Sequence, residues 1–196
     1  MHVVSTRKKK NLYNSAFLLS KNGDILDVYD KIKLVPFGEY IPFGNFFAQL
    51  GVFGLATDQL IGFSSGEIDG VFETDKFGLF KVLICYESIF SESAATQNKR
   101  PSWIVHITND AWFGAFSGPQ QHLTLARMRA IEQGVPLVRS ANTGISAIID
   151  PFGRIHSKLN LGTSAYIDGV LPSALKPTLY SQVGERRLSF LLFIWL

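Results

Sequence analysis

An apolar run that stops at the only cysteine of the chain constrains the fold most strongly. Leu79, Phe80 and residues 82–84 have the composition of a buried strand. Cys85 follows directly, and the polar residues from Glu87 onward predict a turn into a helix. A cysteine at such a strand-to-helix turn lies beside backbone N–H groups that can stabilise a developing negative charge. Taken alone, however, a cysteine is often only a small buried apolar residue, so a catalytic role needs support from elsewhere in the chain.

Further segments of strand and helix character surround this run. Strands are predicted at residues 14–19, 25–29, 71–74, 77–84, 103–108, 136–138, 145–149 and 165–171, and helices at residues 88–97 and 120–133. Asn22-Gly23 predicts a hairpin turn between the first two strands. Paired strands with two intervening helices indicate an α/β layered domain.

Composition agrees with a packed domain and excludes some functions. Of the 196 residues, 46% are hydrophobic and 13% aromatic, which is typical of a globular protein rather than a disordered one. The net charge of +3 comes partly from the single run at residues 7–10, and it does not indicate a nucleic-acid partner. A single cysteine excludes an internal disulfide.

Residues 43–63 are unusually apolar for a connection between elements. Phe43, Phe46, Phe47 and Phe53 lie here, and the only charged residue is Asp58. A buried helix is one interpretation, but repeated glycines interrupt any helical period. We therefore expect an exposed apolar arm that contacts lipid or an apolar substrate.

The C-terminal residues 188–196 are also apolar, and they follow Arg186-Arg187. A membrane-spanning helix needs about 20 apolar residues, so this run has about half the required length. The pattern predicts the start of a transmembrane helix at residues 186–196. A terminal element packed into the core is the alternative.

Cys85 needs activation before it can act as a nucleophile, because an ordinary thiol is mostly protonated at neutral pH. His106 is expected within a strand and His122 within a helix, and their spacing implies no pairing with Cys85, so both are interpreted as structural. Lys31 opens a Pro/Gly-rich loop and Glu39 lies toward its far end, so one rigid loop can direct both side chains to a common point. An ammonium group beside a thiol favours the thiolate and can stabilise an oxyanion. The sequence contains no CxxC, HExxH, GxGxxG or Walker A pattern, so neither a metal nor a nucleotide cofactor is expected.

These positions carry a resemblance to a known family. The matching segments are Tyr29-Asp30-Lys31, Leu34-Val35-Pro36-Phe37-Gly38-Glu39-Tyr40-Ile41-Pro42, Ile84-Cys85-Tyr86-Glu87, Asn109-Asp110-Ala111-Trp112-Phe113-Gly114, Gln121-His122-Leu123, Ala126-Arg127-Met128-Arg129-Ala130-Ile131-Glu132 and Arg139-Ser140-Ala141-Asn142-Thr143-Gly144-Ile145-Ser146. Over about residues 12–185, the chain closely resembles the apolipoprotein N-acyltransferases. These are bacterial membrane enzymes whose extracytoplasmic domain belongs to the nitrilase superfamily of carbon–nitrogen hydrolases. The loop together with Cys-Tyr-Glu is more typical of this acyltransferase branch than of the soluble nitrilases.

The resemblance implies an αββα sandwich with a Glu–Lys–Cys triad. Cys85 matches the nucleophile, which takes an acyl chain from a phospholipid as a thioester and passes it to the α-amino group of a diacylglyceryl-cysteine at an apolipoprotein N-terminus. Lys31 matches the triad lysine, and it would hold the oxyanion together with the backbone N–H of Tyr86. Glu39 matches a supporting glutamate, and Glu87 matches a further active-site carboxylate.

The resemblance also implies where and with what the protein works. Residues 1–185 would form a nitrilase-like domain on the periplasmic face of a bacterial inner membrane, with residues 186–196 entering that membrane. The partners would be the phospholipid donor and the apolipoprotein acceptor, with no nucleic acid and no metal or other cofactor. The protein would be a monomer.

One departure from the family pattern concerns the general base. In the family this glutamate belongs to an earlier strand–helix unit, upstream of all the matching segments. The only acids before Lys31 are Asp24, Asp27 and Asp30, and none of them matches it. We therefore expect an incomplete sandwich that has little or no activity by itself. A soluble carbon–nitrogen hydrolase and a non-catalytic lipid-binding remnant are the alternatives.

Overall fold

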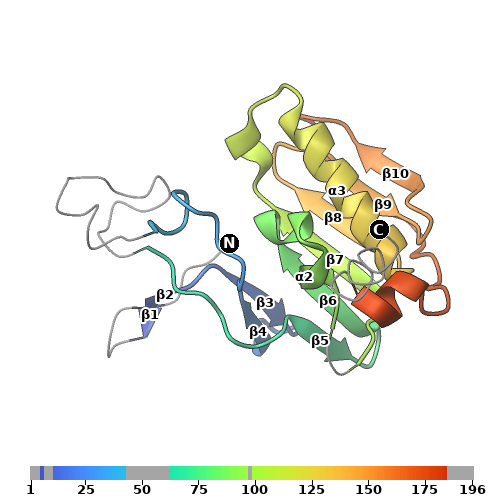
Figure 1. The fold of residues 1–196 in the computed structure, drawn as a ribbon, viewed down its shortest axis with the longest axis horizontal. Helices are drawn as coiled ribbons and strands as arrows, with labels where there is room; N and C mark the ends of the chain where they lie inside the picture. Colours follow the sequence, from blue (N-terminus) through green and yellow to red (C-terminus); the bar gives the residue numbers. More distant parts are fainter. Residues whose placement is uncertain (1–4, 7–10, 43–61, 97–98, 185–196) are drawn as a thin grey trace, which may run out of the picture. The chain divides into compact units, whose positions relative to one another are not determined.

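The computed structural model describes residues 5–6, 11–42, 62–96 and 99–184 (Figure 1). The chain divides into two compact units, Met1–Gly70 and Val71–Leu196, and each is described by itself.

The first unit contains two antiparallel pairs of strands. β1 (Ser5–Thr6) pairs with β2 (Asn11–Leu12), and β3 (Ser15–Leu19) pairs with β4 (Ile25–Asp30). The turn between β3 and β4 is closed by the Ser20 N–H, which donates to the Asp24 carbonyl at 2.8 Å. Gly23 occupies a left-handed conformation in this turn, with φ of +89°, which glycine adopts without steric cost. The predicted hairpin is confirmed.

The second unit is built on one six-stranded sheet in the order β10–β9–β8–β7–β6–β5. Its strands are β5 (Val71–Thr74), β6 (Gly78–Ile84), β7 (Trp103–Thr108), β8 (Leu137–Ala141), β9 (Ser146–Ile149) and β10 (Ile155–Leu159). The three central strands β6, β7 and β8 are parallel, and the outer pairings are antiparallel. The carboxyl ends of parallel strands share one edge of a sheet, where sites in α/β folds form. Cys85, Asn109 and Asn142 follow these three ends directly.

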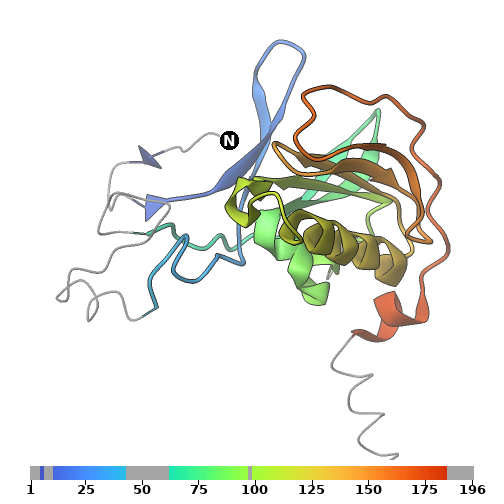
Figure 2. The ribbon, with the colours of Figure 1, turned by 90° about the horizontal axis from the view of Figure 1, so that it is seen from above.

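Four helical segments belong to the second unit. They are the 3-10 helices η1 (Cys85–Ile89) and η2 (Asp110–Phe113) and the α-helices α2 (Ser91–Ala94) and α3 (Gly118–Gln133). α3 has Pro119 in its first turn and ends at Gly134, which is left-handed with φ of +63°. Figure 2 shows α2 and α3 on the same face of the sheet.

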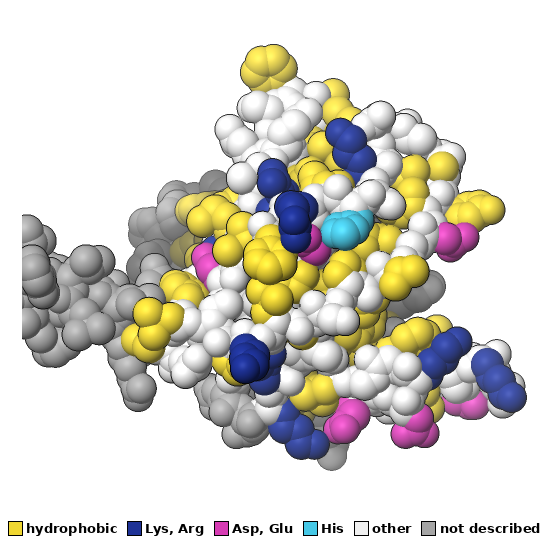
Figure 3. Space-filling model, turned by 90° about the vertical axis from the view of Figure 1, so that its right-hand side faces the viewer, with side chains coloured by type: hydrophobic (Ala, Val, Ile, Leu, Met, Phe, Trp, Pro, Cys, Tyr) yellow, Lys and Arg dark blue, Asp and Glu magenta, His cyan; other side chains and the backbone are white. Residues whose placement is uncertain are grey.

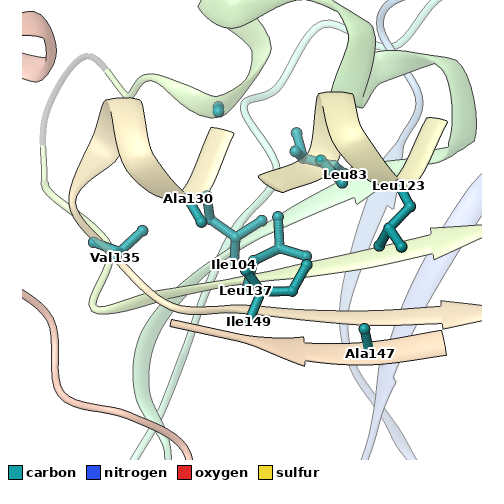
Figure 4. Close-up of a cluster of buried hydrophobic side chains, with 10 residues drawn as sticks. Leu83, Ile104, Leu123, Ala130, Val135, Leu137, Ala147 and Ile149 are labelled. Carbon is teal, nitrogen blue, oxygen red and sulfur yellow. The ribbon is translucent and has the colours of Figure 1, made fainter. Parts of the chain in front are cut away.

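The core lies between this face of the sheet and α3 (Figure 4). Leu123, Ala126 and Ala130 of α3 belong to one buried cluster with Ile104 of β7 and residues of β6, β8 and β9. The small alanines let the helix lie close to the sheet, and each large apolar side chain buried here stabilises the fold by about 1.5–3 kcal/mol. This packing fixes the strand ends that carry the polar side chains of the site.

Two predicted elements are wrong. The helix expected at residues 88–97 is only the two short segments η1 and α2, because Phe90 between them is extended. The strand expected at residues 165–171 is absent, and the last strand of the described residues is β10 instead. Tyr166 and Val170 are 83% and 88% exposed, so the apolar character of that stretch does not reflect burial. β10 has weaker hydrophobicity but alternates half-buried and exposed side chains, as an edge strand does.

Two other predictions fall on residues that the structure does not describe. The apolar arm, with Phe43, Phe46, Phe47 and Phe53, lies outside the described residues, and so do residues 186–196. Among the helices that are described, none has the length and hydrophobicity needed to cross a membrane.

Candidate active site

Cys85 occupies a strained turn at the end of β6. Its φ is +49°, the left-handed region, which costs a residue with a side chain about 1–2 kcal/mol. The next residues continue as η1, so the N–H of Tyr86 lies in the first turn of a 3-10 helix, where N–H groups have no partner within the helix. Strained backbone of this kind clusters at functional sites.

Glu87 stabilises this turn from below. Its side chain is buried, with 1% exposure of the residue, and its Oε2 accepts the Ile84 N–H at 2.8 Å. A buried carboxylate that accepts the N–H of the residue before Cys85 holds the end of the strand against the helix that follows.

A group of buried polar side chains surrounds the Cys85 carbonyl. His106 Nε2 lies 3.0 Å from this oxygen and His122 Nε2 lies 3.2 Å from it. Ser88 Oγ is 3.0 Å from His122 Nε2 and 3.3 Å from the Cys85 carbonyl. All three side chains are essentially inaccessible to solvent. The predicted absence of a link between these histidines and Cys85 is therefore wrong, although the link is to the backbone of Cys85.

A buried ion pair ties the two histidines together. Arg139 Nη2 donates to Asp110 Oδ2 at 2.6 Å, and both side chains are fully buried. Asp110 Oδ1 lies 2.9 Å from His122 Nδ1, and Arg139 Nη1 lies 2.8 Å from His106 Nδ1. Each charged group therefore also contacts one histidine, and we call these five residues, His106, Asp110, His122, Arg139 and Ser88, the buried network.

The contacts of the network determine one histidine tautomer. A guanidinium group only donates, so His106 Nδ1 must accept from Arg139. The proton of the neutral ring is then on Nε2, which donates it to the Cys85 carbonyl. His122 faces the opposite partner, because the Asp110 carboxylate accepts a hydrogen bond from Nδ1–H.

The charges of the ion pair affect their own protonation. Burial alone would raise the pKa of Asp110, but the hydrogen bond with His122 and the positive charge of Arg139 outweigh it and hold the pKa below its usual value. Burial lowers the pKa of Arg139, and the charges of Asp110 and Cys85 oppose that change. Asp110 is therefore ionised at neutral pH, and Arg139 remains a cation.

The first unit contains a second buried ion pair. Lys31 Nζ donates to Glu39 Oε2 at 2.7 Å, and the two residues are 1% and 8% exposed. Glu39 also accepts from Asn14 Nδ2 at 2.6 Å and from the Val35 N–H at 2.8 Å. The loop that contains these residues is short and closed, with a bridge between Pro36 and Tyr40. The structure therefore brings Lys31 and Glu39 together at one point of one ordered loop, as the sequence predicts.

Two glycines allow this loop to close. A Cβ at Gly66 would lie 2.0 Å from the Asp30 carbonyl oxygen, and one at Gly62 would lie 2.6 Å from the Glu39 carbonyl oxygen. The N–H of Gly66 donates to the Lys31 carbonyl at 2.9 Å. The segment after residue 61 therefore packs directly on the backbone of the residues that form the ion pair.

The site contains no metal-binding group in the described part of the chain. No three His, Cys, Asp or Glu side chains there are arranged to hold a metal ion. The chemistry that the described groups can support is nucleophilic attack by a thiol, with a cation and backbone N–H groups to stabilise an oxyanion.

Comparison with known proteins shows the family. The family model described as carbon-nitrogen hydrolase matches residues 1–175. The chain belongs to the carbon-nitrogen hydrolase family. Within it, the chain is 49% identical to the apolipoprotein N-acyltransferase of Rhodopseudomonas palustris over 179 residues, which are 91% of this chain and 33% of that protein. It is 47% identical to the one of Rickettsia prowazekii over 188 residues, 93% of this chain and 37% of that protein. The chain spans about a third of the length of these curated relatives.

Solved structures show the same fold at low sequence identity. Saccharomyces cerevisiae Nit3, a member of the nitrilase superfamily, matches with a TM-score of 0.61 and 21% identity, covering 83% of this chain and 54% of that one. A variant of the amidase from Nesterenkonia sp. AN1 matches with a TM-score of 0.58 and 20% identity, covering 99% and 66%. The fold is therefore the α/β fold of this carbon-nitrogen hydrolase superfamily, as predicted.

Proposed function

We propose that this chain carries the nucleophile of a lipoprotein N-acyltransferase. The acyl donor is a phospholipid, and the acceptor is the α-amino group of the diacylglyceryl-cysteine at an apolipoprotein N-terminus. The single observation that carries this proposal is the 49% identity to an apolipoprotein N-acyltransferase over 91% of the chain. That match includes a cysteine in a strained turn at the carboxyl end of a central parallel strand.

The reaction has two balanced steps. In the first, Cys85 Sγ attacks the ester carbonyl of the phospholipid, and the lysophospholipid leaves as an alcohol that takes up a proton. In the second, the amine attacks the thioester carbonyl, the amide forms, and the Cys85 thiol is restored. A thioester suits this sequence because it is reactive toward amines.

The other groups take roles around the oxyanion. The Lys31 ammonium and the Tyr86 backbone N–H stabilise the negative charge of each tetrahedral intermediate. Glu39 holds the ammonium of Lys31, with which it is paired at 2.7 Å. Glu87 is a further active-site carboxylate, and its hydrogen bond to the Ile84 N–H shapes the turn that carries Cys85.

Exposed aromatic side chains support contact with a lipid substrate. Trp112 and Phe116, between β7 and α3, are 58% and 88% exposed. Figure 3 shows one face of the molecule on which hydrophobic side chains lie among Lys and Arg side chains, a combination that suits a membrane with anionic headgroups. The apolar arm with Phe43, Phe46, Phe47 and Phe53 would add to this contact. We place the protein, as a monomer, on the periplasmic face of a bacterial inner membrane, where residues 186–196 enter the lipid.

We also propose that these 196 residues alone transfer acyl chains poorly. Deprotonation of the thiol in this family uses a glutamate that none of the acids before Lys31 matches. Two other functions remain as alternatives: a carbon–nitrogen hydrolase acting on a small amide, and a protein that binds lipid without catalysis. An amidase of the same fold from Nesterenkonia sp. AN1 reacts with acrylamide at its active site cysteine, so the fold also accommodates small amides.

Mass spectrometry with a phospholipid separates these functions. The chain is fused behind the upstream residues of the Rhodopseudomonas palustris relative, incubated with phospholipid in detergent, and measured as an intact protein. We expect an adduct of one acyl chain that neutral hydroxylamine removes and that Cys85→Ala lacks. Addition of a peptide with an N-terminal diacylglyceryl-cysteine should move the acyl chain to that peptide as a hydroxylamine-resistant amide.

The remaining outcomes identify the alternatives. Hydrolysis of a small amide without any lipid adduct would identify a carbon–nitrogen hydrolase. Binding of phospholipid with neither an adduct nor hydrolysis would identify the non-catalytic protein. The same adduct on the unfused chain would contradict our expectation that it is nearly inactive alone.

A further inference from the structure

Three sequence segments that the proposed chemistry leaves without a role meet at one point. Asp110 follows β7, His122 lies on α3, and Arg139 lies within β8. Their side chains are 3% exposed or less, and all three join the buried network. The hydrogen bonds from the network to the candidate nucleophile go to the carbonyl oxygen of Cys85.

Part of this network has the hydrogen-bond order of a serine hydrolase. Ser88 Oγ contacts His122 Nε2 at 3.0 Å, and His122 Nδ1 contacts Asp110 Oδ1 at 2.9 Å. Ser88, however, is completely buried, so no substrate carbonyl can approach its hydroxyl. The same hydroxyl lies 3.3 Å from the Cys85 carbonyl, which makes it part of the support of that backbone.

The Cys85 carbonyl needs such support because of its own conformation. A cysteine at φ of +49° gains about 1–2 kcal/mol by returning to an ordinary backbone conformation. That return would rotate the peptide group between Cys85 and Tyr86, and it would carry the carbonyl away from its donors. The same peptide group contains the Tyr86 N–H, so its orientation also decides where that N–H points.

We propose that His106 is a positioning residue that holds Cys85 in its reactive conformation, with Arg139 fixing the tautomer that allows this. The proposal rests on the proposed function only for the meaning of that reactivity. His106 Nε2–H donates to the Cys85 carbonyl at 3.0 Å, because Arg139 Nη1 occupies Nδ1 at 2.8 Å. The Asp110 carboxylate neutralises Arg139 and thereby allows a buried cation to play this part.

The strand register explains why His106 can reach the turn. β6 and β7 are parallel, and Leu83 is paired with His106. His106 therefore lies two residues behind Cys85 on the neighbouring strand, and its side chain is buried below the end of β6. Arg139 is paired with His106 in the same way on β8, which is the next strand of the sheet.

Two variants of His106 separate positioning from a purely structural role. The side-chain amide of His106→Gln reaches the place of Nε2 and keeps a donor for the Cys85 carbonyl, but it gives up the acceptor for Arg139. The amide of His106→Asn reaches the place of Nδ1 and keeps that acceptor, but it gives up the donor. Each variant thus loses one buried hydrogen bond, and their melting temperatures should be similar.

The measurement is the rate of alkylation of Cys85, the only thiol, by iodoacetamide in the 196-residue chain. We expect His106→Asn to react about tenfold more slowly than the wild type, since a hydrogen bond worth about 1.4 kcal/mol corresponds to a factor of ten. His106→Gln should stay within about threefold of the wild type, which the same relation equates with less than about 0.7 kcal/mol. The ¹³Cα and ¹³Cβ chemical shifts of Cys85 report its backbone conformation, and they should change only in His106→Asn.

The outcomes are distinct. Equal rates for both variants and the wild type would overturn the proposal. So would rates that fall in both variants together with their melting temperatures, since that is the pattern of a structural residue. Because the assay needs no lipid, a slow His106→Asn variant supports the positioning role even if the phospholipid experiment shows no acyl adduct.

Discussion

The two units each contain one buried ion pair, and the two pairs are built differently. Lys31 and Glu39 are eight residues apart in one loop, and the other partners of Glu39 are local or come from the adjacent strand. Arg139 and Asp110 are 29 residues apart, on neighbouring strand ends, and each also contacts a histidine. The first pair is a local device of one loop, whereas the second connects β6, β7, β8 and α3.

This difference teaches which cation is available for chemistry. The amino group of Lys31 binds one carboxylate oxygen of Glu39, so a flexible lysine side chain presents a compact charge at the end of a loop. The guanidinium of Arg139 is occupied by His106, Asp110 and the Ile145 carbonyl. Arg139 therefore belongs to the scaffold, and Lys31 suits an oxyanion.

Removal of each cation should give the largest contrast. Arg139→Met leaves Asp110 as a buried charge without its cation, which should lower the free energy of unfolding by about 3–5 kcal/mol. Lys31→Met should cost about 1.5–3 kcal/mol, because Glu39 keeps the donors of Asn14 and Val35. Urea unfolding of both variants gives the two values. Equal losses, or a larger loss for Lys31→Met, would show that the two ion pairs are not built as described.

Gly144→Ala tests how tightly the buried network is packed. A Cβ at this position would lie 2.1 Å from Asp110 Oδ2, so the carboxylate has to move away from Arg139. We expect a loss of about 2 kcal/mol, in the range for overpacked sites, together with slower alkylation of Cys85. The neighbouring exposed variant Thr143→Ala is the control, and it should change stability by less than about 0.5 kcal/mol. A Gly144→Ala protein as stable as this control would contradict the close approach.

Glu39→Gln tests the local pair without changing the shape of the side chain. The carboxylate accepts hydrogen bonds from Lys31, Asn14 and the Val35 N–H, whereas an amide offers one acceptor oxygen and two donors of its own. We expect a loss of about 1–2 kcal/mol in urea unfolding, with no change in the rate at which H₂O/D₂O exchange opens the core strand β7. Faster exchange of β7 would show that this pair also supports the central sheet.

The smallest effect is expected at Asp150, which lies apart from both ion pairs. Burial would raise its pKa, but hydrogen bonds from Arg154, His156 and the Phe152 N–H lower the pKa to about 2. A carboxyl with a depressed folded pKa stabilises the protein above its unfolded pKa of about 3.9, and this stability is lost as the pH falls through 2. Since Arg154 is largely exposed, we expect the wild type to exceed Asp150→Asn by about 1 kcal/mol at pH 7.

Unfolding at several pH values checks this prediction. The difference between the two proteins should shrink below pH 4 and approach zero near pH 2. A difference that stays constant with pH would mean that the turn depends on the shape of the Asp150 side chain and not on its charge.

The sequence predicts the elements whose signals are local. The β3–β4 hairpin, the strands that become β6 and β7, and the helix α3 follow from apolar periodicity and turn residues. The Lys31–Glu39 pair is predictable for the same reason, because both residues belong to one closed loop. The failures at residues 88–97 and 165–171 have the opposite cause, since amphipathic or apolar character there is not matched by a partner surface.

The buried network could not be predicted from spacing. His106, Asp110, His122 and Arg139 meet because β6, β7 and β8 are aligned in parallel register, and that register is a property of the assembled sheet. One signal was present in the sequence, namely the polar motifs directly after the strands at Asn109-Asp110 and within Arg139-Ser140-Ala141-Asn142. Polar residues that follow several parallel strands converge at one edge, and on that basis His122 also deserved a functional interpretation.

The most direct test of the central claim measures whether the folded turn makes Cys85 a nucleophile. The 196-residue chain is mixed with p-nitrophenyl butyrate, and the mass of the intact protein is followed with time, both folded and in urea with a free-cysteine standard for the solvent effect. The account predicts a hydroxylamine-labile butyryl adduct that forms about tenfold faster in the folded chain and is absent from Cys85→Ala. Acylation that is slower in the folded chain than in urea would contradict it, because Cys85 would then be an inert buried thiol.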